Sequence, residues 1–169
     1  NRVELFADAL PALQALAARW PIAAVTNGNA DLHGIGLAAH FRTTVSAREF
    51  GIGKPDPRIF HEACRRLDVP PHEVLHIGDD WALDVVGAHG AGLHSAWVRR
   101  ESDPTMPAGA AQANCVVRDL NELVAAFSEV HLVDIDRAAL EGAAERQDVA
   151  RAPQLHLHGG VDLTGIAIL

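Results

Sequence analysis

The sequence predicts an α/β fold in which a parallel sheet is covered by helices on both faces. Two observations lead to this prediction. Short apolar runs alternate along the chain with amphipathic segments of helical period, and each run is apolar throughout, which is typical of strands buried on both faces. The chain has 169 residues, 49% of them hydrophobic, which is enough for one domain with a single sizeable core.

In the first part of the chain, turn signals and apolar periodicity separate helices from strands. Residues 8–20 predict a helix with Asp8 as its N-cap, because apolar side chains recur on one face. Residues 22–26 predict a strand that ends at the turn signal "NGN". A short helix is expected over residues 32–41, followed by the strand "TTVSA" at residues 43–47.

The next part shows the same alternation with a clearer helix start. Asp56 at the N-cap and Pro57 at the first helical position predict a helix over residues 56–69. A loop rich in Pro, Gly and Ala is expected over residues 101–114. The remaining elements expected up to residue 127 are strands at 74–77, 94–98 and 115–117 and helices at 82–91 and 120–127.

A change in pattern near Ser128 predicts a domain boundary. We expect residues 1–127 to form the core and residues 128–169 to form an additional tail. Within the tail, the sequence "VHLVDID" at residues 130–136 predicts a strand, residues 138–146 a helix, and "LHLHGG" a further strand.

Composition excludes several classes of partner. The net charge is −8, and no dense cluster of Lys and Arg exists, so we expect no binding to nucleic acid or to anionic membranes. No apolar run approaches the ~20 residues of a membrane span. Cys64 and Cys115 lie far apart with no CxxC motif, which favours a reducing, cytoplasmic location. The sequence leaves the oligomeric state open.

Three segments carry side chains suited to phosphate chemistry, and each follows or precedes an element of the expected sheet. "AVTNGN" offers the Thr26 hydroxyl and backbone N–H groups around Asn27 and Gly28. "GIGKPDP" offers Lys54 ahead of a helix. "HIGDDWALD" places three carboxylates directly after a strand: Asp79, Asp80 and Asp84.

Ligands of such sheets bind beyond the carboxyl ends of the strands, so these segments are expected to meet there. Phosphoryl transfer uses a hard cation with oxygen ligands, a lysine that neutralises the transferring group, and hydroxyl or amide donors. The sequence therefore predicts a Mg²⁺ site and a small phosphorylated ligand. Each segment also has a purely structural interpretation: the "TNG" turn can be only a turn, Lys54 a solvated lysine, and Asp79 or Asp80 a helix N-cap.

The three segments together resemble motifs of the haloacid dehalogenase-like (HAD) superfamily of hydrolases. "AVTNGN" is similar to its second motif, "GKPDPRIF" to its third, and "HIGDDWALDVVGAHGAGLHSAWV" to its fourth. The resemblance runs continuously from residue 3 to about residue 100, and it implies a Rossmann-like core. Within the superfamily, the sequence is most similar to bacterial phosphatases that act on FMN and on 5-amino-6-(5-phosphoribitylamino)uracil, a riboflavin precursor.

The resemblance implies a role for each residue of the predicted site. Thr26 and Asn27, with the backbone at Gly28, would bind the phosphoryl group, and Lys54 would neutralise it and order the nucleophile. Asp79 would ligate Mg²⁺ directly. Asp84 would support the metal shell, either through water or by orienting Lys54, and Asp80 would act in the second shell or as a helix cap.

The chain departs from the family pattern at its beginning. The first motif of the family, a strand ending in Asp-x-Asp that carries the nucleophile and the general acid/base, is not found before Val3. We therefore expect a catalytically incomplete piece of a longer enzyme, with a gap in the sheet between the strands of the second and fourth motifs.

Four interpretations of this departure stay open. Asp134 and Asp136 could form a permuted first motif. The tail could instead resemble a nucleotide-binding α/β unit. The tail could also be an additional strand-helix-strand without a role in the site, or a neighbouring reading frame joined to the core, and this is the interpretation that we favour. The chain as a whole could be a non-catalytic module that binds phosphate or metal.

Overall fold

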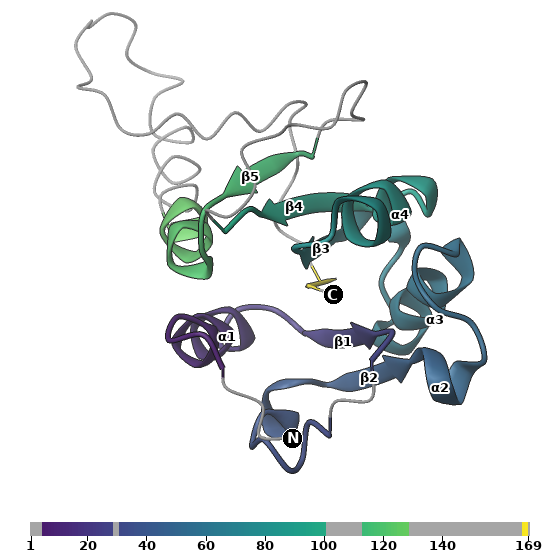
Figure 1. The fold of residues 1–169 in the computed structure, drawn as a ribbon, viewed down its shortest axis with the longest axis horizontal. Helices are drawn as coiled ribbons and strands as arrows, with labels where there is room; N and C mark the ends of the chain where they lie inside the picture. Colours follow the sequence, from purple (N-terminus) through teal and green to yellow (C-terminus); the bar gives the residue numbers. More distant parts are fainter. Residues whose placement is uncertain (1–4, 29–30, 101–112, 129–166, 169) are drawn as a thin grey trace, which may run out of the picture.

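The computed structural model describes residues 5–28, 31–100, 113–128 and 167–168, and it has the predicted α/β fold. The described strands form two sheets. One contains β1 (Ala23–Thr26) and β2 (Thr43–Ser46); the other has the order β5 (Cys115–Val117), β4 (His94–Val98), β3 (Val74–Gly78) and β6 (Ala167–Ile168). All the described pairs are parallel (Figure 1).

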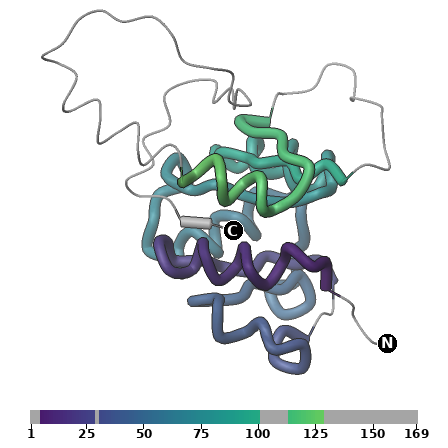
Figure 2. Tube along the Cα trace, turned by 90° about the vertical axis from the view of Figure 1, so that its left-hand side faces the viewer, coloured from purple at the N-terminus to yellow at the C-terminus, as the bar shows by residue number. Residues whose placement is uncertain are grey.

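Helices cover both faces of the sheets, as the sequence predicts. Helix α1 (Ala9–Ala17) and the helical residues 120–128 lie on one face, where Figure 2 shows them in front of the strands. The other face carries α2 (Ala47–Phe50), α3 (Pro57–Leu67) and α4 (Gly87–Gly90) (Figure 1). Each face has its own apolar cluster, one built around α3 and the other around α1 and residues 120–128.

Helix α3 begins as its sequence predicts. The Asp56 carboxylate accepts a hydrogen bond from the Arg58 backbone N–H at 3.0 Å, and Pro57 takes the first helical position. The core face of the helix is fully buried over Ile59 and Phe60. Capping and apolar spacing are both local properties, and here they agree with the tertiary structure.

The expected N-cap of α1 is wrong. Asp8 precedes the helix, but its side chain makes no capping hydrogen bond. Its carboxylate instead accepts hydrogen bonds from the Arg100 guanidinium at 2.8 Å and from the Leu120 backbone N–H at 2.8 Å. Asp8 thus joins α1 to two segments more than ninety residues away, and it is buried in doing so.

The helix expected over residues 32–41 is also wrong, since only one 3₁₀ turn, η1 (Ala38–His40), forms there. The Asp31 carboxylate accepts from the His33 backbone N–H and stabilises a turn. Gly36 then takes a φ of +77°, a conformation that glycine adopts without strain. A second 3₁₀ turn, η2 (Pro71–Glu73), leads into β3.

The helix expected over residues 82–91 forms in two parts. The π-helical segment η3 (Trp81–Val86) comes first, and α4 follows it directly. Asp84 lies within η3, and π-helical turns of this kind often hold functional side chains.

The two sheets are separated where the family resemblance places a further strand. An apolar cavity of about 230 Å³ lies between β1 and β3, lined by Leu16, Val25 and Ile77 among others. Strand β6 pairs with β3 on this side, through Val74 and Leu75 (Figure 1). The predicted tail strand at residues 130–136, with Asp134 and Asp136, lies outside the described residues.

None of the helices in the described part of the chain is both long and apolar enough to span a membrane.

Candidate functional site

The turn after β1 and the loop before α3 are held together by one side chain. The Asn27 amide donates a hydrogen bond to the Lys54 carbonyl oxygen at 2.8 Å, and its Oδ1 accepts from the Lys54 backbone N–H at 2.7 Å. A Cβ on Gly53 would lie 2.7 Å from Asn27 Oδ1, so only glycine allows this close approach. The predicted meeting of these two segments therefore occurs, with Asn27 as the clamp.

Thr26 stands at the end of β1 and shapes the turn that follows it. Its Oγ1 accepts a hydrogen bond from the Gly28 backbone N–H at 2.9 Å. The hydroxyl hydrogen of Thr26 is left to donate to a ligand, because this bond uses only an oxygen lone pair. Thr26 is half-buried, whereas Asn27 and Gly28 are exposed.

Lys54 and Asp84 form an ion pair that joins the third segment to the first two. Lys54 Nζ lies 2.6 Å from Asp84 Oδ1, and both side chains are largely shielded from water, with 13% and 5% of their surface exposed. The same oxygen lies 2.8 Å from His76 Nε2, and the other carboxylate oxygen accepts from the Asp80 backbone N–H at 3.0 Å. Asp84 therefore receives three donors, and it orients Lys54.

Burial and charge together fix the protonation of this cluster. Burial lowers the pKa of His76 below its ordinary value, against the raising effect of Asp84, so the ring is neutral and its Nε2–H donates. Burial alone would raise the pKa of Asp84, but the hydrogen bonds and charge supplied by His76 and Lys54 outweigh it and hold that pKa well below the usual range. The result is an ionised carboxylate facing a lysine ammonium.

Gly78 is required by the position of Asp84. A Cβ at Gly78 would overlap the Asp84 carboxylate. The strand β3 therefore ends in a residue without a side chain so that the carboxylate can approach its backbone. The glycine of "HIGDD" is therefore a packing requirement of Asp84, which lies six residues later in the chain.

The other two carboxylates of the motif have different surroundings. Asp80 accepts a hydrogen bond from the Leu83 backbone N–H at 2.8 Å and caps η3, which is one of the two roles that the sequence left open for it. Asp79 is exposed, and its carboxylate makes no hydrogen bond or ion pair with any residue that the structure describes. Its backbone is fixed, because the Trp97 indole N–H donates to the Asp79 carbonyl oxygen at 3.0 Å.

These surroundings bear on which residues could hold a cation. Over the described residues, no group of three or more His, Cys, Asp or Glu side chains is arranged to hold a metal. Asp79 is the carboxylate of this motif that is left available as a ligand, since Asp84 is committed to Lys54 and His76. Mg²⁺ is often bound by one or two carboxylates with waters and substrate phosphate as the other ligands, so Asp79 fits as one ligand of such a site.

Sequence reasoning missed two residues of this site. The sequence places His76 and Trp97 in strands, and it does not predict their hydrogen bonds to Asp84 and to the Asp79 backbone. A histidine two positions before the Gly-Asp pair was the available signal for His76, because a polar side chain within a buried strand needs a partner. Trp97 gave no such signal, since its partner Asp79 belongs to a neighbouring strand end.

A sequence model of a hydrolase family, the haloacid dehalogenase-like hydrolases, matches residues 1–92. This match covers more than half of the chain and includes all three motif segments. The chain belongs to this family. The recognition made from the motifs is thereby confirmed, and so is the fold class.

Several curated relatives of the chain are phosphatases by name. The chain is 36% identical over 106 residues to the 5-amino-6-(5-phospho-D-ribitylamino)uracil phosphatase YigB of Escherichia coli, covering 63% of this chain and 44% of the relative. It is 41% identical over 107 residues to a phosphoserine phosphatase of Thermus thermophilus, and this match covers 60% of this chain and 42% of the relative. The chain thus spans less than half the length of these relatives.

Solved structures of the family superpose on the described fold. A 2-haloacid dehalogenase from Pseudomonas syringae superposes with a TM-score of 0.70 at 32% sequence identity, and the match covers 76% of this chain and 55% of the dehalogenase chain. A HAD phosphatase from Thermococcus onnurineus superposes with a TM-score of 0.66 at 29% sequence identity, and the match covers 73% of this chain and 58% of the phosphatase chain. The family therefore includes neighbours with two different named chemistries, and the fold alone does not choose between them.

Proposed function

We propose that the chain is the greater part of the core of a Mg²⁺-dependent phosphomonoester hydrolase that acts on a small phosphorylated metabolite. The observation that carries this proposal is the shielded Lys54, held by Asp84 and by the Asn27 clamp at the carboxyl ends of β1 and β3. A lysine fixed in this way offers its charge at one point in space. Such preorganised charge is what a transferring phosphoryl group requires.

The residues around Lys54 would divide the work of binding. The Thr26 hydroxyl and the backbone N–H groups of the turn would donate to phosphoryl oxygens, and Lys54 would neutralise their charge. Asn27 acts on the geometry, because its side chain is used to fix the Lys54 backbone. Asp84 and His76 would keep the ammonium group in place throughout.

A bound Mg²⁺ would supply further neutralisation of phosphoryl charge. Asp79 would be a direct ligand of the ion. Asp80 would stabilise the start of η3, directly after Asp79, by capping it. Trp97 would keep the Asp79 backbone in position through its indole N–H.

The named relatives support a phosphorylated metabolite as substrate but differ in which one. Their names include a ribitylaminouracil phosphate, phosphoserine, and, for a relative from Methanopyrus kandleri, glyceraldehyde 3-phosphate. We take the riboflavin-pathway phosphate and FMN as the first substrates to test, because the motif sequences are most similar to phosphatases of that kind.

The test uses the natural reading frame that contains these residues together with its upstream sequence. We expect the purified product to hydrolyse small phosphomonoesters with Mg²⁺ and to lose this activity in EDTA. Lys54→Met is expected to lower kcat at least a hundredfold while weakening Mg²⁺ binding far less, because the lysine acts on the phosphoryl group. Undiminished hydrolysis in EDTA would contradict the metal, and phosphate binding without any hydrolysis would favour the non-catalytic module.

A further inference from the structure

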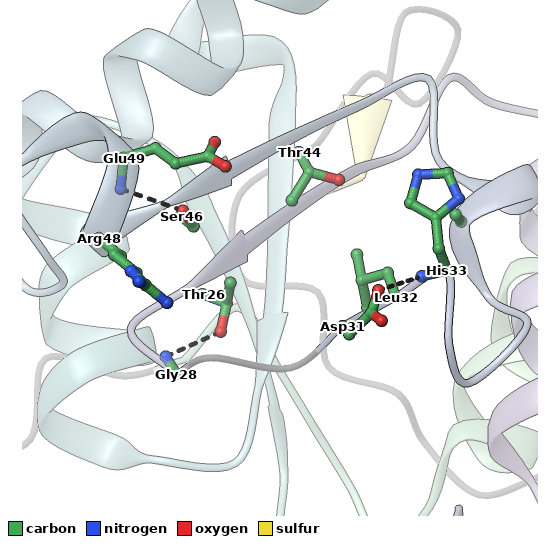
Figure 3. A pocket seen from close by; sticks show the side chains of 10 residues that line it. Thr26, Gly28, Asp31, Leu32, His33, Thr44, Ser46, Arg48 and Glu49 are labelled. Atoms are coloured by element: carbon green, nitrogen blue, oxygen red, sulfur yellow. Dashed lines mark hydrogen bonds between the residues drawn. The ribbon is translucent and has the colours of Figure 1, made fainter.

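A second cavity, of about 350 Å³, opens over the sheet of β1 and β2. We call it the polar pocket; the lining residues used below are Thr26, Asp31, Thr44, Ser46, Arg48 and Glu49. Figure 3 shows Ser46, Arg48 and Glu49 at one end of it and Asp31 at the other. Its volume lies within the range of small-molecule sites.

The floor of the pocket is a row of hydroxyl groups. Thr26 and Ser46 are register partners across β1 and β2, and Thr44 lies two residues before Ser46 on the same face. The opposite face packs on α3 through Val25 and Val45 and is apolar. Thr26, Thr44 and Ser46 are half-buried, so their hydroxyl groups line an open part of this face and are accessible to a ligand.

These hydroxyl groups keep hydrogen-bonding capacity for a ligand. Ser46 Oγ accepts from the Glu49 backbone N–H at 3.2 Å, and Thr26 Oγ1 accepts from Gly28, so both still have a hydrogen to donate. The Thr44 hydroxyl has no hydrogen-bond partner within the described part of the chain. The Arg48 guanidinium likewise makes no ion pair with a described residue, and it adds donors at the α2 end.

The pocket also carries two carboxylates, and they decide the charge of a suitable ligand. Asp31 and Glu49 would repel a second phosphate or a carboxylate placed in the pocket. They would accept hydrogen bonds from ligand hydroxyl groups, while Arg48 and the protein hydroxyls would donate to them. A chain of hydroxyl groups matches this lining because each hydroxyl is both donor and acceptor.

Thr26 and Gly28 belong both to the polar pocket and to the turn that binds phosphate in the proposed function. We propose that the polar pocket takes the uncharged, hydroxylated carbon chain of a sugar or polyol phosphate whose phosphate group lies at the "TNG" turn. This inference rests on the proposed function for the phosphate end of the ligand. It adds the class of the organic part and the residues that select it.

The experiment compares three probes on the 169-residue chain by isothermal titration: inorganic phosphate, D-ribitol 5-phosphate and n-pentyl phosphate. The two esters have the same number of carbons and differ in the hydroxyl groups. We expect the ribitol ester to bind at least tenfold more tightly than the pentyl ester. We expect Thr44→Val to reduce this preference about fivefold or more and Arg48→Gln to reduce it as well, both without weakening inorganic phosphate.

Thr43→Val is the matched control, because it makes the same change on the other face of β2, and it should leave the preference intact. Circular dichroism checks that each variant keeps its fold; Arg48 is exposed, so its variant tests the proposal even if Thr44→Val does not fold. Equal binding of the two esters, or a preference unchanged in both pocket variants, overturns this inference while phosphate binding still supports the proposed function. Binding of none of the three probes overturns the phosphate site and this inference with it.

Discussion

Asp79, Asp80 and Asp84 stand close together in one motif, yet each carboxylate has a different neighbour. Asp84 is buried against Lys54 and His76, Asp80 caps η3, and Asp79 is exposed. The three carboxylates are close in sequence, but burial and hydrogen bonds give each of them a different role. The sequence predicted the cluster, but burial and partners are tertiary properties that it does not contain.

This separation predicts unequal effects of removing charge. In an active parent enzyme, Asp79→Asn is expected to lower kcat/KM with Mg²⁺ by a hundredfold or more, because a direct ligand contributes both charge and geometry. Asp80→Asn is expected to lower it less than tenfold, since an asparagine can also accept the capping hydrogen bond. Steady-state kinetics over a Mg²⁺ titration measures both, and equal losses in two well-folded variants would contradict the assignment.

His76 predicts a pH dependence of stability. The pKa of His76 is lowered in the folded chain from an ordinary value of 6.5. On acidification the imidazole is therefore protonated in the unfolded chain at a higher pH than in the folded chain. The stability that depends on neutral His76 is therefore fully present above about pH 6.5 and is lost as the pH falls toward the lowered pKa, by up to about 1.4 kcal/mol per pH unit.

Urea unfolding between pH 7.5 and 5 measures this dependence. His76→Gln, which keeps a donor for Asp84, is expected to flatten the loss of stability on acidification. His72→Gln, on an exposed side chain, is the control and should leave the dependence as it is. The same slope in His76→Gln as in the unchanged protein would show that the buried ring does not carry the effect.

At the level of helices and strands, the difference between Asp8 and Asp56 shows what local sequence can predict. Both residues precede a helix and both were expected to cap it. Asp56 does so, because the Arg58 N–H that donates to it and the proline that starts the helix are the next residues along the chain. Asp8 does not, because Arg100 offers its carboxylate a charged partner that no local pattern reveals.

The stability of α1 should follow from this difference. We expect Asp8→Ala to lower the free energy of unfolding by about 1 to 3 kcal/mol, because it leaves the Leu120 N–H and the partly shielded Arg100 without their acceptor. Asp56→Ala, which removes an exposed cap, should cost less. Urea unfolding of both variants gives the comparison, and a larger loss for Asp56→Ala would show that the link between α1 and residue 120 is weak.

The absence of the helix expected over residues 32–41 has a similar explanation. Its apolar spacing was helical, but Gly34 and Gly36 interrupt it, and the Asp31 side chain stabilises a turn instead. Strands were predicted more reliably, since the bounds of β1, β2, β3, β4 and β5 each lie within one residue of the strand that the sequence predicts. Which strands pair could be inferred only from the family resemblance.

For the molecule as a whole, the separation between β1 and β3 is the feature with the widest consequences. Strand β6 pairs with β3 through Val74 and Leu75, so over the described residues the Ile77 and Gly78 end of β3 has no partner on that side. The apolar cavity lies beside it. The site of Lys54 therefore stands at the rim of a sheet whose middle is not filled by the described strands.

This arrangement predicts that the 169-residue chain binds phosphate but does not hydrolyse phosphomonoesters. Covalent phosphoryl transfer needs a carboxylate free to attack, and the carboxylates around Lys54 are otherwise engaged: Asp84 receives three donors and Asp80 caps η3. Asp79 is exposed, and the proposed function assigns it to the Mg²⁺ ion. Binding uses Thr26, the turn and Lys54, all of which are in place.

The measurement compares the purified chain with the product of a reading frame extended by its upstream sequence at the same Mg²⁺ concentration, using inorganic phosphate for binding and a small phosphate ester for turnover. We expect comparable phosphate binding and turnover only in the longer protein. Turnover by residues 1–169 that disappears in Asp134→Asn would reverse this conclusion, because it would show that the tail supplies the nucleophile as a permuted motif. Turnover that survives Asp134→Asn would also contradict this prediction, because it would show that the 169-residue chain supplies a nucleophile other than Asp134.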